Sequence, residues 1–202
     1  MTRTLFAALL LAAAPALVAA AADDPKKPDY FPLANGHKWE YAAQAGENKV
    51  DITITVTAVK TENGKIKATR VVTEPNRDTT EEITVDATGV SGHLFPGIPV
   101  EHRATLLKYP VKPRDTWTDK FQLKEKDVLA LSTVKETEEV KVPAGTFQAV
   151  PVETGVIIGE GEESFGITTW YADGTGVVKQ KVVLGNNACV VTLQLKKFTP
   201  GK

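Results

Sequence analysis

The sequence predicts an all-β protein built as a single curved antiparallel sheet, half-barrel or barrel-like, of about 8–11 strands. Three observations lead to this fold class. Apolar and polar residues alternate along several segments, and short clusters of Gly, Asn and Pro separate those segments. We find no convincing amphipathic helix, whose apolar residues would recur every three to four positions.

Residues 1–22 have the pattern of a cleaved signal peptide. Arg3 supplies a positive charge, Leu5–Val18 is apolar apart from Pro15, and Ala19–Ala22 provides small residues for cleavage. The apolar run is short for a membrane-spanning helix, which needs about 20 residues. Cleavage after Ala20, Ala21 or Ala22 fits this pattern, and we favour Ala22. We therefore expect a periplasmic or secreted protein with no membrane span in the mature chain.

The mature chain is expected to form one domain. Residues 23–29 (DDPKKPD) read as a flexible tether, because they hold two prolines, five charges and nothing to bury. Residues 30–199 then form a single β domain. The whole chain carries 24 basic and 25 acidic residues, and removal of Arg3 changes the net charge from −1 to −2. This balance gives no electrostatic reason to bind nucleic acid.

The strands follow from period-two patterns. In Lys49–Ala58, Val50 and every second residue after it are apolar, and Asp51 and its alternates are polar. Asn63-Gly64 predicts a type I′ hairpin turn, because both positions need positive φ. Further strands are predicted at Lys65–Thr73, Glu82–Ala87, Trp117–Leu123, Val128–Val142, Thr146–Glu153, Ser164–Ala172, Val177–Leu184 and Cys189–Lys197.

Two segments are predicted to lie outside the strands. Pro96–Pro113 contains four prolines and is interpreted as a long crossing loop with one helical turn near Glu101–Leu107. Gly155–Gly166 contains four glycines and is interpreted as a mobile, solvated hairpin loop.

The two halves of the chain share a faint repeat. Trp39 and Trp117 each follow a Pro by seven residues, and Asp86–Val90 resembles Asp173–Val177. We interpret these matches as two duplicated β-meanders within one sheet. Chance recurrence of Pro, Trp and Gly is the alternative.

No catalytic, metal or cofactor motif emerges. His37, His93 and His102 lack the spacing of a zinc site. Cys189 is the only cysteine, and its alternates Val191 and Leu193 place it on an apolar face, so we expect a buried, inert thiol. No serine lies in a nucleophile elbow. We expect no cofactor and no metal.

Large aromatic residues are the candidate ligand-binding groups. They sit at or near strand ends, where they either fill the core or line an apolar cavity. These residues are Trp39, Tyr41, Trp117, Phe121, Trp170 and Tyr171.

Three motifs resemble those of bacterial exported proteins and lipoproteins that have no assigned activity. Tyr30–Tyr41 (YFPLANGHKWEY) resembles their YFPLxxGxxWxY opening, and Val142–Phe147 matches their VPAGTF turn. Trp170–Lys179 (WYADGTGVVK) is similar to their WYAxGxGxVK segment, with Asp173 in place of the usual Pro. The chain lacks the lipobox cysteine of the lipoprotein members. At the level of fold, the pattern is similar to periplasmic half-barrels that carry lipids or lipoproteins.

We therefore weigh three functions. The first is a non-enzymatic carrier of an apolar small molecule or lipid in the concavity of the sheet. The second is a structural or interaction module that contacts another protein of the cell envelope. The third is a hydrolase with a dispersed site, which no motif supports.

Overall fold

The computed structural model describes residues 28–94, 103–123, 125–159, 161, 163–185 and 189–201. The predicted signal peptide (1–22), most of the tether (23–29), and His102 lie outside the described residues.

Strands account for nearly all of the regular structure in these ranges, and no helix occurs in them. The strands are β1 (Lys38–Ala45), β2 (Asn48–Glu62), β3 (Lys65–Glu74), β4 (Arg77–Asp86), β5 (Gly89–Gly92), β6 (Ala104–Lys108), β7 (Thr116–Leu123), β8 (Lys126–Val134), β9 (Glu138–Val142), β10 (Gly145–Ile158), β11 (Glu163–Ala172), β12 (Gly176–Leu184) and β13 (Cys189–Thr199). The predicted fold class is confirmed. The 13 described strands exceed the predicted 8–11, partly because Val128–Val142 divides into β8 and β9.

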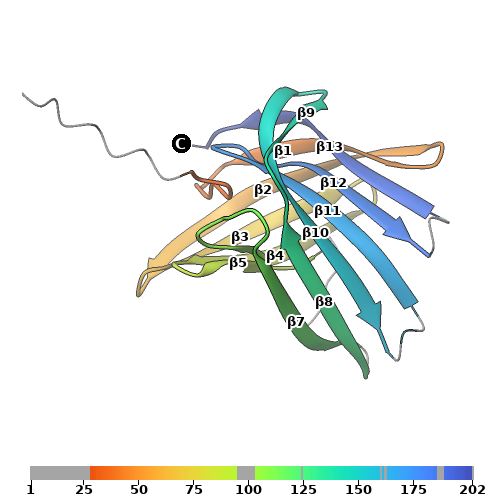
Figure 1. Cartoon of the computed structure of the whole chain (residues 1–202). Helices are drawn as coiled ribbons and strands as arrows, with labels where there is room; N and C mark the ends of the chain where they lie inside the picture. Colours follow the sequence, from red (N-terminus) through yellow and green to blue (C-terminus); the bar gives the residue numbers. More distant parts are fainter. Residues whose placement is uncertain are drawn as a thin grey trace, which may run out of the picture.

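The strands form one antiparallel sheet that curls into a nearly closed, barrel-like shape (Figure 1). Its order is β6-β5-β4-β3-β2-β1-β13-β12-β11-β10-β8-β7, and β9 pairs with the start of β10. The sheet is thus two meanders, β1–β6 and β7–β13, joined where β1 pairs with β13. Trp39 and Trp117 are each the second residue of the first strand of a meander. Duplication itself stays a prediction.

Alternation places one face of each strand inside the curled sheet. The interior holds three apolar clusters, whose central residues include Tyr41, Val72 and Leu195 in the first, Ile83, Leu107 and Tyr171 in the second, and Val156, Ile167 and Val182 in the third. Burial of these side chains supplies the main stabilisation, because the single cysteine forms no disulfide. The predicted hairpin after β2 is confirmed, since Asn63 and Gly64 have φ values of 50° and 73°.

Two predicted loops are wrong in part. Ala104–Lys108 forms β6, not a helical turn, because β5 supplies it with a backbone partner. Gly155–Gly166 is mostly strand, since β10 runs to Ile158 and β11 begins at Glu163. Gly155 lies opposite Leu131 on one side and Gly166 on the other, so neighbouring strands hold the glycine-rich segment extended.

The prediction of a buried Cys189 is also wrong. Cys189 is exposed, although Leu193 and Leu195 on the same side of β13 are buried. The side of β13 that was predicted to be apolar is the buried side further along the strand, at Leu193 and Leu195. Cys189 is the first residue of β13, and the buried part of this strand begins further along, at Leu193.

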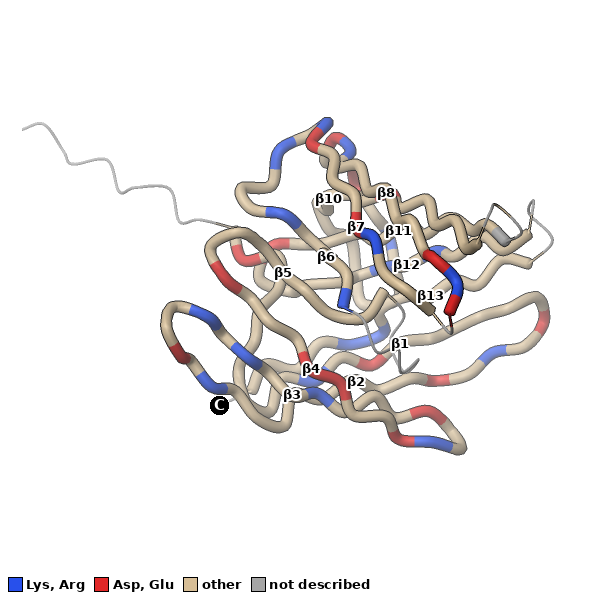
Figure 2. Tube along the Cα trace, turned by 90° about the horizontal axis from the view of Figure 1, so that it is seen from below, with Lys and Arg blue, Asp and Glu red and all other residues tan. Residues whose placement is uncertain are grey.

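Charged residues of both signs are interspersed over the strands and their connecting turns (Figure 2). No helix among the described residues has the length and apolar character required to cross a membrane.

Candidate functional site

The two end strands of the sheet, β6 and β7, are linked by side chains. Asp119 on β7 accepts hydrogen bonds from the backbone N–H and the hydroxyl of Thr105 on β6, at 3.1 and 3.0 Å. Trp117 Nε1 donates to the carbonyl of Thr105 at 2.9 Å. The Tyr171 hydroxyl donates to the carbonyl of Leu106 at 3.1 Å. We call this line of contacts the seam, because it joins strands that share no backbone ladder.

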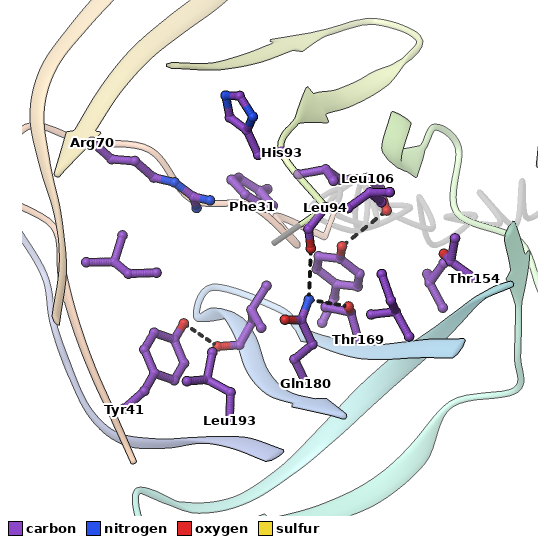
Figure 3. Close-up of a pocket in the computed structure, with 15 residues that line it drawn as sticks. Phe31, Tyr41, Arg70, His93, Leu94, Leu106, Thr154, Thr169, Gln180 and Leu193 are labelled. Atoms are coloured by element: carbon purple, nitrogen blue, oxygen red, sulfur yellow. Dashed lines mark hydrogen bonds between the residues drawn. The ribbon is translucent and has the colours of Figure 1, made fainter. Parts of the chain in front are cut away.

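A pocket lies inside the sheet next to the seam and contains a cavity of about 50 Å³ (Figure 3). Most of its lining is apolar, including Phe31, Ile54, Leu94, Leu106, Val152, Ile167, Val177 and Leu193. A cavity of this size accommodates a few water molecules or a small chemical group, whereas pockets for whole small-molecule ligands measure about 300–1,000 Å³.

A buried ion pair projects into this apolar interior. Arg70 on β3 lies directly opposite Glu81 on β4, and their residues are only 8% and 3% exposed. Nε and Nη2 of Arg70 both approach Oε2 of Glu81 at 2.8 Å. Arg70 lines the pocket and reaches into it from β3 (Figure 3). The pairing offsets part of the large desolvation penalty of two buried charges.

Neutral polar groups complete the lining. Gln180 Nε2 donates to Thr169 Oγ1 at 3.0 Å and to the carbonyl of Leu94 at 3.4 Å. The Tyr41 hydroxyl donates to the carbonyl of Val177 at 2.8 Å. Thr154, also in the lining, shares a 2.8 Å hydrogen bond with Ser132. Each of these groups is hydrogen-bonded to a residue of another strand, which fixes its position.

Burial raises the pKa of the Tyr41 phenol and that of the Tyr171 phenol. The positive charge of Arg70 opposes both rises, so its field reaches both rings. The two phenols therefore remain protonated at physiological pH and act as hydrogen-bond donors.

His93 also lines the pocket. Its Nδ1 is buried and has no hydrogen-bond partner among the described residues. His37 lies elsewhere, where its Nδ1 accepts a hydrogen bond from the backbone N–H of Ala34 at 3.3 Å. No group of three His, Cys, Asp or Glu residues in the described ranges is arranged to hold a metal ion.

Of the six predicted aromatic residues, Tyr41 and Tyr171 line this pocket. Trp39 borders an adjoining void of about 20 Å³, donates from Nε1 to the carbonyl of Thr175 at 2.7 Å, and stacks on Phe198. Trp117 lies at the seam.

The other two aromatic residues lie away from the pocket. Phe121 packs against the third apolar cluster. Trp170 belongs to the first cluster and donates from Nε1 to Glu138 at 2.6 Å, with the Lys179 ammonium 4.7 Å from its ring centroid.

The polar residues of the pocket were missed in the sequence, although a signal for them exists. Arg70 stands between Ala68 and Val72 in the buried phase of β3, and Gln180 stands between Val178 and Val182 in that of β12. A polar residue in the apolar phase of a strand marks a buried polar group, and such groups need partners.

Two solved structures resemble this fold. One is a "putative lipoprotein" from Parabacteroides distasonis, with a TM-score of 0.57 and 15% identity over 85% of this chain and 99% of that chain. The other is a "putative exported protein with YmcC-like fold" from Bacteroides fragilis, with a TM-score of 0.59 and 15% identity over 86% of this chain and 100% of that chain. At this identity the likeness concerns the fold alone. No family model and no curated protein matches the chain.

Proposed function

We propose that this chain is an exported, non-catalytic binding protein that holds an apolar or lipid-like ligand inside its curled sheet. The observation that carries the proposal is the interior pocket, where a mostly apolar lining includes Arg70, one member of a buried ion pair. A lining of this composition suits a ligand with an apolar body and one polar group.

Export is supported by the signal-peptide pattern of residues 1–22. The names of the two similar structures, an exported protein and a lipoprotein, agree with it.

The cavity of about 50 Å³ is smaller than a lipid-like ligand needs, so ligand entry requires the sheet to widen. The seam favours such widening. Separation of β6 from β7 breaks only side-chain hydrogen bonds, at Thr105, whereas separation of any other neighbouring strands breaks a backbone ladder. Leu106 lines the pocket, so movement of β6 enlarges it.

The test is the intact mass of the mature protein, Asp23–Lys202, purified from the periplasm without detergent. The proposal predicts an excess mass under native conditions that disappears on denaturation and extracts into organic solvent. Leu193→Phe adds bulk to the pocket lining and is expected to give the apo mass. Val183→Phe, outside the pocket on β12, is the matched control and should retain the ligand. An apo mass for the wild-type protein that stays unchanged when lipids are added contradicts the proposal.

One observation favours a second candidate, an interaction module of the cell envelope. Three large side chains are exposed on neighbouring strands, Leu129 (38%), Leu131 (52%) and Ile157 (43%), and Leu129 lies opposite Ile157. Exposed apolar patches of this kind mark protein contacts. This candidate predicts that Leu131→Lys abolishes co-purification of an envelope protein and leaves the native mass of the chain unaltered apart from the substitution.

A further inference from the structure

We propose that the Arg70 end of the interior pocket is a subsite for a carboxylate group. This inference rests on the proposed function, because it names the polar group of the ligand that the pocket holds.

Glu81 engages only part of the hydrogen-bond donors of Arg70. A guanidinium carries five N–H donors in a planar fork. Glu81 engages two of them, both through the single oxygen Oε2, and these are the pairings of Arg70 with described residues. The remaining donors belong to a side chain that is 8% exposed and lines the pocket, so an oxyanion that enters the cavity can accept hydrogen bonds from them. Hydrogen bonds from a guanidinium to an oxyanion are charge-assisted and about twice as strong as neutral ones.

A second, independent observation comes from His93. The side chain of His93 lines the same pocket, and its buried Nδ1 has no hydrogen-bond partner among the described residues. In the tautomer that carries a proton on Nδ1, the ring donates a hydrogen bond to a ligand oxygen. Figure 3 shows Arg70, on β3, and His93, which directly follows β5, both close to Phe31. Arg70 and His93 thus line one mostly apolar pocket, and each has hydrogen-bonding capacity that the described residues do not use.

The charge and size of the site favour a carboxylate over a phosphate. Glu81 already supplies one negative charge, and a doubly charged phosphate would add a large repulsion in a low-dielectric interior. A carboxylate adds a single charge, and its planar pair of oxygens matches the guanidinium fork. The cavity of about 50 Å³ has room for this small group, while the surrounding apolar residues suit an attached hydrocarbon chain.

The carboxylate has two sources, the head group of a fatty acid or a free short-chain acid. Calorimetric titration of the delipidated mature protein with dodecanoate, dodecanol and acetate separates them. We expect dodecanoate to bind about ten- to a hundredfold more tightly than dodecanol, as charge-assisted hydrogen bonds contribute about 1.5–3 kcal/mol. Tight binding of acetate, with no gain from the longer chain, assigns the subsite to free short acids.

The decisive variant is Arg70→Met with Glu81→Met, which removes both charges together so that neither is left unpaired. The expected result is equal affinity for dodecanoate and dodecanol. Gln180→Met, which spares the ion pair, is the second variant and should keep the preference for dodecanoate. The matched control is Lys135→Met with Glu153→Met, an exposed pair formed by the residue after β8 and a residue of β10, which should also keep it.

Two outcomes overturn the inference, and they are distinguishable from failure of the proposed function. If dodecanoate and dodecanol bind the wild-type protein equally, the pocket binds lipid without a carboxylate subsite. If the double Arg70 and Glu81 variant retains the preference, the subsite lies elsewhere. If none of the three probes binds and the periplasmic protein has the apo mass, both proposals fail.

Discussion

Asp119 on β7 replaces a backbone partner for Thr105 on β6. Its two carboxylate oxygens accept hydrogen bonds from the N–H and the hydroxyl of Thr105 at 3.1 and 3.0 Å, and Trp117 Nε1 donates to the carbonyl of the same residue. Both backbone groups of Thr105 that point across the seam are therefore satisfied without a strand ladder. The edges of the sheet are held together by groups that a few substitutions remove.

The first prediction concerns this seam. Asp119→Ala leaves the N–H of Thr105 without its acceptor, and we expect a loss of about 1–3 kcal/mol in the free energy of unfolding. Urea denaturation measures this loss, and hydrogen exchange should show faster exchange of the β6 amides. The control is Asp127→Ala, in the same hairpin, where the carboxylate accepts one exposed bond from Gln122 and the loss should stay below about 0.5 kcal/mol. Equal losses in the two variants would show that the seam contributes nothing.

The second prediction compares two glycines. A Cβ on Gly89 would lie 2.2 Å from the carbonyl oxygen of Leu107, and its φ of 153° disfavours any other residue. Gly89→Ala must therefore separate β5 from β6, with an expected loss of more than about 3 kcal/mol. Gly155→Ala is the control, because nothing lies within 4 Å of its Cβ position, and it should change stability by less than about 1 kcal/mol. Thermal melting of both variants gives the comparison.

The sequence was sufficient to predict the sheet, because the alternation that indicates a strand lies within the residues of that strand. Period-two alternation located most strands, and Asn63-Gly64 located a turn whose geometry only glycine and a few polar residues adopt. The short strands β5 and β6 escaped detection, since their extended state depends on pairing between residues distant in sequence, such as Gly89 with Lys108. Neighbouring strands likewise override the flexibility expected for Gly155.

The pocket was harder to predict than the fold. Tyr41 and Tyr171 were identified because large aromatic residues are conspicuous in a sequence. Arg70 and Glu81 lie 11 positions apart, and only the register of β3 against β4 makes them a pair. Arg70 in an apolar phase signals a buried charge, but its partner follows from the hairpin geometry and not from composition.

The third prediction is that alkaline titration of the tyrosines accompanies unfolding. Burial raises the pKa of the Tyr41, Tyr171 and Tyr30 phenols above the ordinary value of 10.0, and burial followed by the charge of Asp29 raises the pKa of Tyr109 to about 12. Between pH 10 and about pH 12 the tyrosines of the unfolded chain release protons that those of the folded chain keep. The contribution of the protonated phenols to the stability of the fold is therefore complete below pH 10 and is lost as the pH rises through about 12. Phenolate absorbance should therefore appear together with loss of the β-sheet circular dichroism signal. Ionisation near pH 10 in a folded protein would contradict this prediction.

The fourth prediction uses the exposed thiol of Cys189. A solvent-accessible thiol reacts with a disulfide reagent in the native state. Since the chain has one cysteine, we expect one equivalent to react at similar rates in buffer and in denaturant. Cys189→Ser should abolish the reaction and leave the melting temperature unchanged, because the side chain is exposed. A reaction that requires denaturant would place the thiol in the core.

The fifth prediction separates the buried ion pair from exposed ones. Arg70→Met leaves Glu81, which is 3% exposed, as an uncompensated charge, and we expect a loss of about 3–5 kcal/mol in the free energy of unfolding. Adding Glu81→Met removes that charge and should recover most of the loss, since apolar replacement of a whole buried pair is often close to neutral. The same cycle on Lys135 and Glu153, whose side chains are 46% and 53% exposed, should give a coupling of about 0–1 kcal/mol. Urea denaturation of the four combinations at each pair measures both couplings.

A double variant at Arg70 and Glu81 as unstable as Arg70→Met alone would mean that the charges are solvated in the folded protein. Recovery of stability by the double variant would show that the fold does not need the charged pair for its stability, which agrees with the proposed role of Arg70 in ligand binding.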